Sequence, residues 1–242
     1  MFGVIVNTFA VIIGSFIGLI FKKGISEKIA SAVMTGIGLC SLYLGVSNAL
    51  VDGNDALVAI LSIVIGAVIG TLLDLDGKIN KLGDWVSARY SKETEGKISV
   101  AEGFVTACLL FCIGAMTIAG SIQAGLGDNT TLYTKSVLDF ISAIMLSVSL
   151  GIGVIFSSAF VLIFQGAIAL LAGVIEPILN AKGMLQSIIC VGGILIIGLG
   201  LNILGITKIK VANYLPALIV APLVCWLLSL IETYNLLEKI CS

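Results

Sequence analysis

The stretch from Phe140 to Ile175 decides the fold, and it reads FISAIMLSVSLGIGVIFSSAFVLIFQGAIALLAGVI. Its 36 residues include no charged side chain. One continuous helix of this length would run about 54 Å at about 1.5 Å per residue, whereas the hydrocarbon core of a bilayer is about 30 Å thick. The chain therefore has to turn inside this stretch, and the glycines and serines of Gly151–Ser158 permit that turn.

The rest of the chain has the same apolar character. Of its 242 residues, 59% are hydrophobic and 11% are charged, against about 25% charged in ordinary soluble domains. So few charges cannot cover a soluble globule, and the apolar content excludes a disordered chain. The net charge of −1 gives no phosphate-seeking surface, so we expect no nucleic-acid partner. The composition predicts an all-α polytopic membrane helix bundle surrounded by lipid.

Eight stretches are long and apolar enough to be transmembrane helices. Each is bounded by charged or turn-forming residues, apart from the pair within the uncharged stretch. The predicted spans are Phe2–Phe21, Ile29–Leu50, Ala56–Leu73, Gly103–Ala124, Ser136–Ile152, Ile155–Ile175, Leu185–Ile206 and Val211–Ile231.

The distribution of Lys and Arg orients these spans, because basic residues concentrate in cytoplasmic loops. With the N-terminus outside, ten of the 13 basic residues face the cytoplasm and three face outward. A seven-span alternative, in which Phe140–Ile175 forms one span, moves Lys182 and Lys239 inside and Lys208 and Lys210 outside, so it also gives ten against three. The eight-span arrangement with the N-terminus outside is the better prediction because one helix across Phe140–Ile175 would be too long for the bilayer.

An internal repeat is predicted from the spacing of the apolar stretches. A shift of 154 residues places Val6–Leu50 on Phe160–Leu204, and Ala56–Leu73 on Lys210–Leu227, without a gap. Five spans precede the second copy, so it would be inverted, as in many secondary transporters. Accidental superposition of short-looped helices is the alternative. Within a single transmembrane domain (1–242), the repeat predicts a first three-helix unit (1–73), a cytoplasmic linker (74–102), a central hairpin (103–152) and a second three-helix unit (155–231).

The linker Asp74–Glu102 is the longest polar segment. Within it Ile79, Leu82, Trp85 and Val86 recur at helical spacing, with charged residues around them. This pattern is typical of an amphipathic helix at the membrane interface. A packed linker helix without a regulatory role explains the pattern equally well.

Small residues indicate where helices approach closely in lipid. The first span contains Gly14-x-x-x-Gly18, and the third contains Gly66-x-x-x-Gly70. In the last span, Pro222 is expected to kink the helix and to free a backbone carbonyl one turn earlier.

Asp139 is the carboxylate that lies clearly inside a predicted span. Lys135 precedes it by one helical turn and is its natural partner. A charged group at this depth is costly unless it is paired or hydrated, so it marks a candidate functional site. The alternative is a structural ion pair that fixes the outer end of the span. Single amides on other spans extend the candidate solute- or ion-binding set: Asn7, Asn48, Gln123, Gln165 and Asn202.

The cysteines give no sign of a disulfide framework or a metal site. Cys40, Cys108, Cys112, Cys190 and Cys225 lie in apolar runs, Cys241 is penultimate, no CxxC pair occurs, and the chain has no His. We therefore expect small buried side chains, no metal and no cofactor. An enzyme is also disfavoured, since no nucleophile lies beside a base and no phosphate-binding loop is present.

Two long motifs carry a family resemblance. The run GAMTIAGSIQAGLGD, followed by LYTKSVLDF and GIGVIFSSAFVLIFQG, resembles the bacterial membrane-protein family of domain of unknown function 554. The opening VIVNTFAVIIGSFIGLIFKKGI extends the resemblance over nearly the whole chain. Ala115 and Thr117 flank Met116, and Phe140 follows Asp139, where the family pattern usually differs. The resemblance implies a protein of the bacterial cytoplasmic membrane and supplies no activity.

Two hypotheses follow for the function. The first is a secondary transporter or channel for a small polar or ionic solute, with Asp139 binding a cation or proton and Lys135 acting as gate or anion contact. The second is a non-transporting membrane scaffold that uses Asp74–Glu102 to dock cytoplasmic partners. Eight short helices make a small bundle for a solute pathway, so we expect a homodimer.

Overall fold

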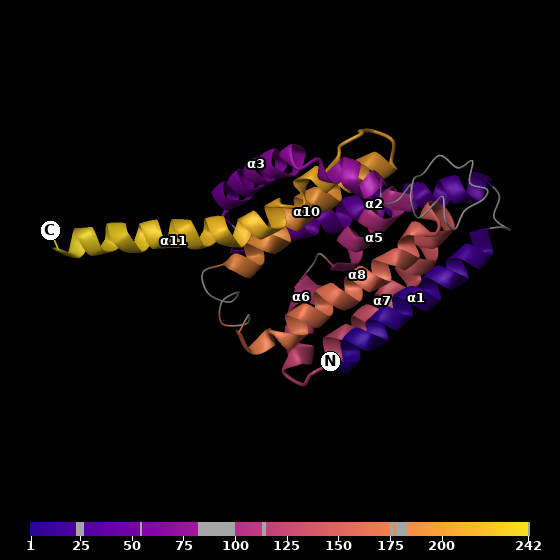
Figure 1. Ribbon diagram of the computed structural model, residues 1–242, viewed down its shortest axis with the longest axis horizontal. Helices are drawn as coiled ribbons and strands as arrows, with labels where there is room; N and C mark the ends of the chain where they lie inside the picture. The colour runs from indigo at the N-terminus through magenta and orange to yellow at the C-terminus, as the bar shows by residue number, and fades with distance from the viewer. Residues whose placement is uncertain are drawn as a thin grey trace.

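A computed structural model describes residues 1–22, 27–53, 55–81, 100–112, 115–174, 177 and 183–241. Within these ranges the chain forms helices and no strand (Figure 1). The all-α fold predicted from composition is therefore confirmed. The labelled helices are α1 (Phe2–Lys22), α2 (Glu27–Ala49), α3 (Ala56–Leu72), α5 (Val100–Cys112), α6 (Ala115–Gly125), α7 (Thr130–Leu150), α8 (Gly153–Leu170), α10 (Met184–Ile203), the 3-10 helix η1 (Val211–Tyr214) and α11 (Ala217–Cys241).

Six helical segments of the described chain are long and apolar enough to cross a bilayer. Two bent pairs raise the number to eight if each pair forms one span. In the first pair, α3 is followed by a short helix, Leu75–Lys81, at 53°. In the second, α5 is followed by α6 at 63°. The eight predicted spans match the upper limit of this count.

Two predicted spans differ from the observed helices. The fourth span is two helices rather than one, because α5 ends at Cys112 and α6 begins at Ala115. Hydropathy does not reveal this break, since apolar and small residues continue across it. The fifth span begins at Thr130 rather than Ser136, because the polar first turns of α7 are helical although they are not hydrophobic.

The turn expected in the uncharged stretch is confirmed. Helix α7 ends at Leu150, and α8 begins at Gly153. Gly151 between them has φ 78°, a left-handed conformation that glycine adopts without the steric cost of a Cβ. The two helices are thereby separate spans.

Helices α1 and α7 run parallel, although about 130 residues separate them. Gly3 lies against Leu132 near the start of both helices, and Gly18 lies against Ser147 near their ends. A Cβ atom on Gly14 would come within 2.5 Å of the Phe140 carbonyl oxygen. The Gly14-x-x-x-Gly18 motif is thus a close backbone contact between α1 and α7.

Helices α2 and α10 run antiparallel and meet at glycines. A Cβ on Gly193 would lie 2.6 Å from the Gly45 carbonyl oxygen, and a Cβ on Gly200 would lie 3.0 Å from that of Gly38. Helices α3 and α11 are also antiparallel, with Gly66 against Ala217. In an eight-span chain whose successive spans alternate in direction, α2 and α10 have to run antiparallel, and so do α3 and α11.

The outer surface of the bundle is apolar. On α1 the large side chains of Phe2, Ile5, Phe9, Ile13 and Phe16 are exposed, while its glycines and Asn7 are buried. An exposed apolar face of this kind is expected for a helix that contacts lipid on one side and protein on the other.

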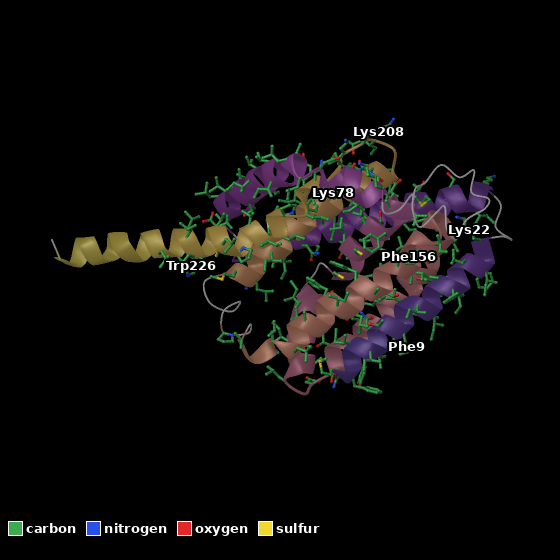
Figure 2. All side chains as sticks on the ribbon, in the orientation of Figure 1. Phe9, Lys22, Lys78, Phe156, Lys208 and Trp226 are labelled. Atoms are coloured by element: carbon green, nitrogen blue, oxygen red, sulfur yellow. The ribbon has the colours of Figure 1, made fainter. Side chains whose placement is uncertain are left out.

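Lysines gather at one end of the bundle, which we call the lysine-rich end. It contains Lys22, Lys78 and Lys208 (Figure 2), together with Lys210, which lines the same cavity as Lys208. Figure 2 shows Lys22, Lys78 and Lys208 toward the upper and right parts of the view. The N-terminus lies at the opposite end, where the Met1 ammonium donates to the Ala124 carbonyl at 2.8 Å.

Two sequence expectations are only partly placed by the structure. Of the proposed amphipathic linker residues, Ile79 lies in the short helix Leu75–Lys81, whereas Leu82, Trp85 and Val86 lie outside the described residues. Pro222 lies inside α11 and is its sixth residue. The last span begins with η1, and its long α-helix starts only at Ala217.

Candidate functional site

The ion pair predicted on α7 is present and buried. The Lys135 Nζ lies 2.8 Å from the Asp139 Oδ1, and the two residues are 6% and 4% exposed. Because α7 begins at Thr130, both side chains lie well inside the helix. A buried pair of opposite charges at this depth is the electrostatic feature around which the candidate site is built.

The polar start of α7 is fixed just before this pair. The Thr130 backbone N–H and hydroxyl donate to the Asp128 carboxylate at 2.9 Å and 2.7 Å. These two hydrogen bonds hold the pKa of Asp128 below its ordinary value. A charged carboxylate at the N-terminus of α7 also interacts favourably with the helix dipole.

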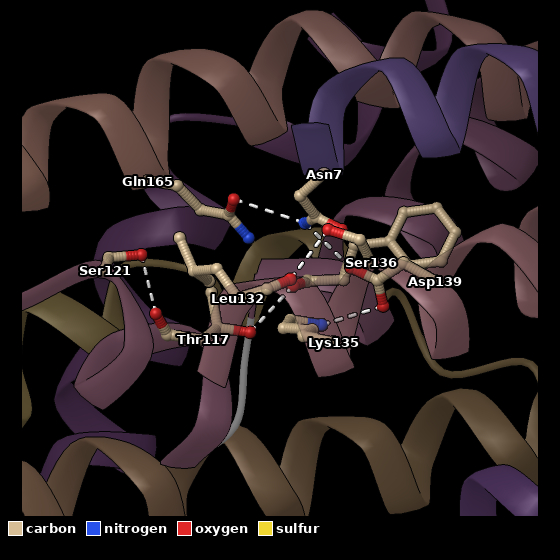
Figure 3. A network of polar contacts seen from close by, with 9 residues as sticks. Asn7, Thr117, Ser121, Leu132, Lys135, Ser136, Asp139 and Gln165 are labelled. Carbon is tan, nitrogen blue, oxygen red and sulfur yellow. Dashed lines mark hydrogen bonds and ion pairs between the residues drawn. The ribbon is translucent and has the colours of Figure 1, made fainter. Parts of the chain in front are cut away.

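Two amides from other helices complete the cluster. Asn7 of α1 donates from Nδ2 to the Asp139 Oδ2 at 3.0 Å and to the Gln165 Oε1 of α8 at 3.2 Å. Both amide residues are fully buried. Figure 3 shows Asn7 between Gln165 and Asp139, with Lys135 below them and joined to the carboxylate by a dashed line. We call Asn7, Lys135, Asp139 and Gln165 the α7 cluster.

Each amide in the α7 cluster has one atom without a hydrogen-bond partner among the described residues. These atoms are the Asn7 Oδ1 and the Gln165 Nε2. The donation from Asn7 to a carboxylate fixes which end of its amide is nitrogen, so its oxygen has to point elsewhere. A buried acceptor and a buried donor are therefore left open to a polar ligand or a water molecule.

The interrupted fourth span lies beside the α7 cluster. Phe111 and Cys112 at the end of α5 pack with Ala143 and Leu146 of α7, which follow Asp139 by one and two turns. The Thr117 hydroxyl of α6 donates to the Phe111 carbonyl at 2.9 Å. Helix ends within a membrane bundle leave backbone groups available, and transporters commonly bind solutes at such breaks.

Two cavities are described elsewhere in the bundle. A polar cavity of about 430 Å³ lies at the lysine-rich end, and an apolar cavity of about 490 Å³ lies between α5, α8, α10 and α11. Residues of the α7 cluster line neither of them. The cluster is thus enclosed by packed side chains in this conformation.

The remaining predicted residues lie away from the α7 cluster. Gln123 is exposed at the end of α6, and its Oε1 accepts from the Thr131 hydroxyl at 2.6 Å. Asn202 fixes the turn after α10, because its Nδ2 donates to the Ile209 carbonyl at 2.7 Å. Asn48 is half-buried near the end of α2. The structure therefore brings together four of the seven predicted residues.

Sequence reasoning did not identify the break between α5 and α6 or the polar cavity. The break could have been suspected from Thr117 and Ser121, which are polar, buried and one turn apart. The Ser121 hydroxyl donates to the Thr117 carbonyl at 2.6 Å. No signal in the sequence places Asp76 and Lys208 on the lining of the same cavity, since more than 130 residues separate them.

The fold and the cluster define a polytopic integral membrane protein with a buried ion pair held by three helices. The chain belongs to the family described as protein of unknown function DUF554, whose model matches residues 2–226. It is therefore a member of the family that its motifs resemble.

Two relatives are similar to this chain over nearly their whole length. The uncharacterized membrane protein YdfK of Bacillus subtilis is 39% identical over 232 residues, covering 94% of this chain and 97% of YdfK. The uncharacterized protein YqgA of Escherichia coli is 32% identical over 222 residues, covering 90% of this chain and 94% of YqgA. No solved structure matches the chain.

Proposed function

We propose that the chain is a secondary transporter or channel for a small polar or ionic solute, with the α7 cluster at the centre of its pathway. The carrying observation is the buried Lys135–Asp139 pair together with two amide atoms that lack partners. Charged residues inside membrane spans are costly and usually mark substrate or ion pathways. A polar solute or ion would use the Asn7 Oδ1 and the Gln165 Nε2.

The helix pairings support an inverted repeat as part of this proposal. If α8, α10 and α11 repeat α1, α2 and α3 upside down, each helix and its counterpart run in opposite directions. The antiparallel contacts of α2 with α10 and of α3 with α11 fit this arrangement. The Asn7–Gln165 hydrogen bond also places α1 in contact with its proposed counterpart α8. In such folds the solute site lies between the repeats near the midplane.

The proposed location is the bacterial cytoplasmic membrane, with the N-terminus outside. The lysine-rich end then faces the cytoplasm, as the distribution of basic residues in membrane proteins requires. The proposed oligomer is a homodimer. Chemical cross-linking in membranes would test it, with a band at twice the monomer mass as the expected result.

Transport is tested with purified protein in proteoliposomes on a solid-supported membrane. Charge movement is recorded after steps of pH, Na⁺, K⁺, glycine and acetate, which sample a proton, two cations, a zwitterion and an anion. The expected result is a transient current with at least one probe, lost in Asp139→Asn and kept in Lys78→Ala, a variant at an exposed lysine. A wild-type current that persists in Asp139→Asn would contradict the role of Asp139.

One observation favours the non-transporting scaffold as a second candidate. The α7 cluster is 0 to 6% exposed and lines neither described cavity, as expected of a structural ion pair. A wild-type chain silent toward all five probes, together with a stability that depends on the pair, would support this candidate.

A further inference from the structure

Each of the three helices that hold the α7 cluster carries a buried serine eight residues from its cluster residue. These serines are Ser15 of α1, Ser147 of α7 and Ser157 of α8. The spacing runs toward the C-terminus on α1 and α7 and toward the N-terminus on α8. Because α1 and α7 are parallel and α8 turns back at Gly151 (Figure 1), the three serines lie on the same side of the cluster. Eight residues of helix span about 12 Å, so the serines form a second polar level nearer the lysine-rich end.

A threonine of α5 lies at the same level. A Cβ on Gly103 would lie 3.2 Å from the Leu150 Cβ, which places the start of α5 against the end of α7. The end of α5 packs on the middle of α7, so the two helices run in opposite directions. Three residues further along α5 and three residues back along α7, Thr106 and Ser147 are therefore opposite one another. We call the four residues of this level the hydroxyl layer: Ser15, Thr106, Ser147 and Ser157.

Three of the four groups in the hydroxyl layer have no hydrogen-bond partner among the described residues. They are the fully buried hydroxyls of Ser15, Thr106 and Ser147. A buried hydroxyl within a helix ordinarily donates to the carbonyl one turn before it, as the Ser62 hydroxyl of α3 does to the Val58 carbonyl at 2.6 Å. The three hydroxyls of the layer do not make this bond. They come from three different helices at one level, so a polar partner between the helices would satisfy them together.

An apolar layer separates the hydroxyl layer from the α7 cluster. Halfway between the two levels, four residues from each, the same three helices carry Val11, Ala143 and Val161. These side chains are fully buried and belong to one hydrophobic cluster. We call these three residues the apolar layer. Hydrophobic constrictions of this kind close a pathway because water does not fill them.

The chemistry of the hydroxyl layer suits water. A hydroxyl group can donate one hydrogen bond and accept others, and a buried water molecule makes about two to four bonds to polar groups that otherwise lack partners. Ser157 donates to the Val154 carbonyl at 2.6 Å, and its oxygen can still accept. The four side chains of the layer are neutral, and their four oxygens are fewer than the about six or more that a hard divalent cation takes.

We propose that the hydroxyl layer is a second polar site, which binds water between α1, α5, α7 and α8, and that the apolar layer is the gate between this site and the α7 cluster. Water would enter from the lysine-rich end, because Ser147 lies four residues, about 6 Å, before the turn at Gly151. The gate rests on the proposed function, since a gate needs a pathway. The water site does not rest on it.

Hydrogen–deuterium exchange of single introduced thiols tests the water site, because the infrared S–H stretch is resolved in an otherwise cysteine-free full chain. The near-isosteric variants Ser15→Cys and Ser147→Cys should each exchange at least about tenfold faster than Ser62→Cys, because water reaches their thiols. Ser62 is the matched control, since it is equally buried and bonded within its own helix. Exchange in both layer variants as slow as in Ser62→Cys would overturn the proposal. A wild-type chain without current toward the five transport probes would contradict transport and leave this readout unaffected.

The gate has its own comparison. Val11→Cys in the same background should exchange as slowly as Ser62→Cys, since water does not fill the apolar layer. In proteoliposomes loaded with a pH-sensitive dye, Val11→Ser and Val161→Ser should each speed the proton flux after an external pH step severalfold, because a hydroxyl lets water cross the layer. Val58→Ser changes a buried valine of α3 outside the layer and should behave as wild type. Fast exchange in Val11→Cys, or equal flux in the layer variants and Val58→Ser, would refute the gate.

Discussion

At the scale of single residues, the α7 cluster combines a satisfied ion pair with two unsatisfied amides. The pair was predictable from sequence, because Lys135 and Asp139 lie one turn apart on any helix that contains them. Their partners were not, because the positions of Asn7 and Gln165 next to Asp139 depend on how α1 and α8 pack on α7. In the sequence, Gln123, Asn48 and Asn202 could not be distinguished from Asn7 and Gln165, because only tertiary packing decides which amides reach Asp139.

A double-substitution experiment distinguishes the cost of leaving one charge unpaired from the net contribution of the ion pair to stability. Asp139→Asn should lower the free energy of unfolding by about 3 to 5 kcal/mol, because it leaves the Lys135 ammonium buried and unpaired. Lys135→Met with Asp139→Leu should be within about 1 kcal/mol of wild type or more stable. The measurement is SDS-induced unfolding in mixed micelles. Equal losses in the single and double variants would argue against an uncompensated charge as the cause.

The two amides should respond differently to removal. Asn7→Leu deprives the Asp139 Oδ2 of its donor and should cost about 1 to 3 kcal/mol. Gln165→Leu removes the acceptor of one Asn7 N–H but also an Nε2 that has no partner, so its cost should be smaller, about 1 kcal/mol. The same unfolding assay checks both variants. A loss of probe-induced current in Gln165→Leu at unchanged stability would point to solute contact, whereas a larger loss of stability than in Asn7→Leu would contradict this assignment of contacts.

At the scale of helices, the glycine motifs predicted close packing but not the partner. The spacing of Gly14 and Gly18 defines a face of α1, and nothing in it selects α7 rather than a neighbour in sequence. The break between α5 and α6 escaped detection because hydropathy averages over about 20 residues. In contrast, the turn at Gly151 was predicted because a single helix across it would be too long for the bilayer.

A pair of alanine substitutions tests the packing of α1 on α7. Gly14→Ala should lower the free energy of unfolding by about 1 to 3 kcal/mol, since the new Cβ would come within 2.5 Å of the Phe140 carbonyl oxygen. Gly36→Ala on α2, where a Cβ meets nothing within 4 Å, should be neutral or stabilising by about 0.5 to 1 kcal/mol. Thermal unfolding in detergent provides the comparison, and an equal destabilisation of Gly36→Ala would mean that the contact of Gly14 with Phe140 does not explain the loss.

At the scale of the whole molecule, the order of the spans was predictable and their arrangement was not. Lengths of apolar stretches suffice to predict an eight-span order, and the placement of lysines predicts its orientation. The parallel contact of α1 with α7 and the meeting of two cavities at Ile79 and Val105 come from tertiary packing. The inverted repeat stays a prediction that the helix directions support.

Orientation in the membrane is directly measurable. In a cysteine-free background, Asp128→Cys should react with a membrane-impermeant maleimide in intact bacterial cells. Lys208→Cys should react only after the cells are permeabilised, because the lysine-rich end is expected to face the cytoplasm. The reverse labelling pattern would invert the proposed orientation, and labelling of both sites in intact cells would refute the assignment of these residues to opposite sides.

The contact of Asn7 with Asp139 has a consequence for biogenesis. The two residues are 132 positions apart, so at about 5 to 20 residues per second the ribosome takes about 7 to 26 s to reach the second after the first. During that interval α1 is already synthesised while the carboxylate that its buried amide will bind does not yet exist. The packing of α1 therefore cannot be completed as this helix is inserted, and the Asn7 amide lacks the carboxylate that it binds in the folded chain until α7 emerges.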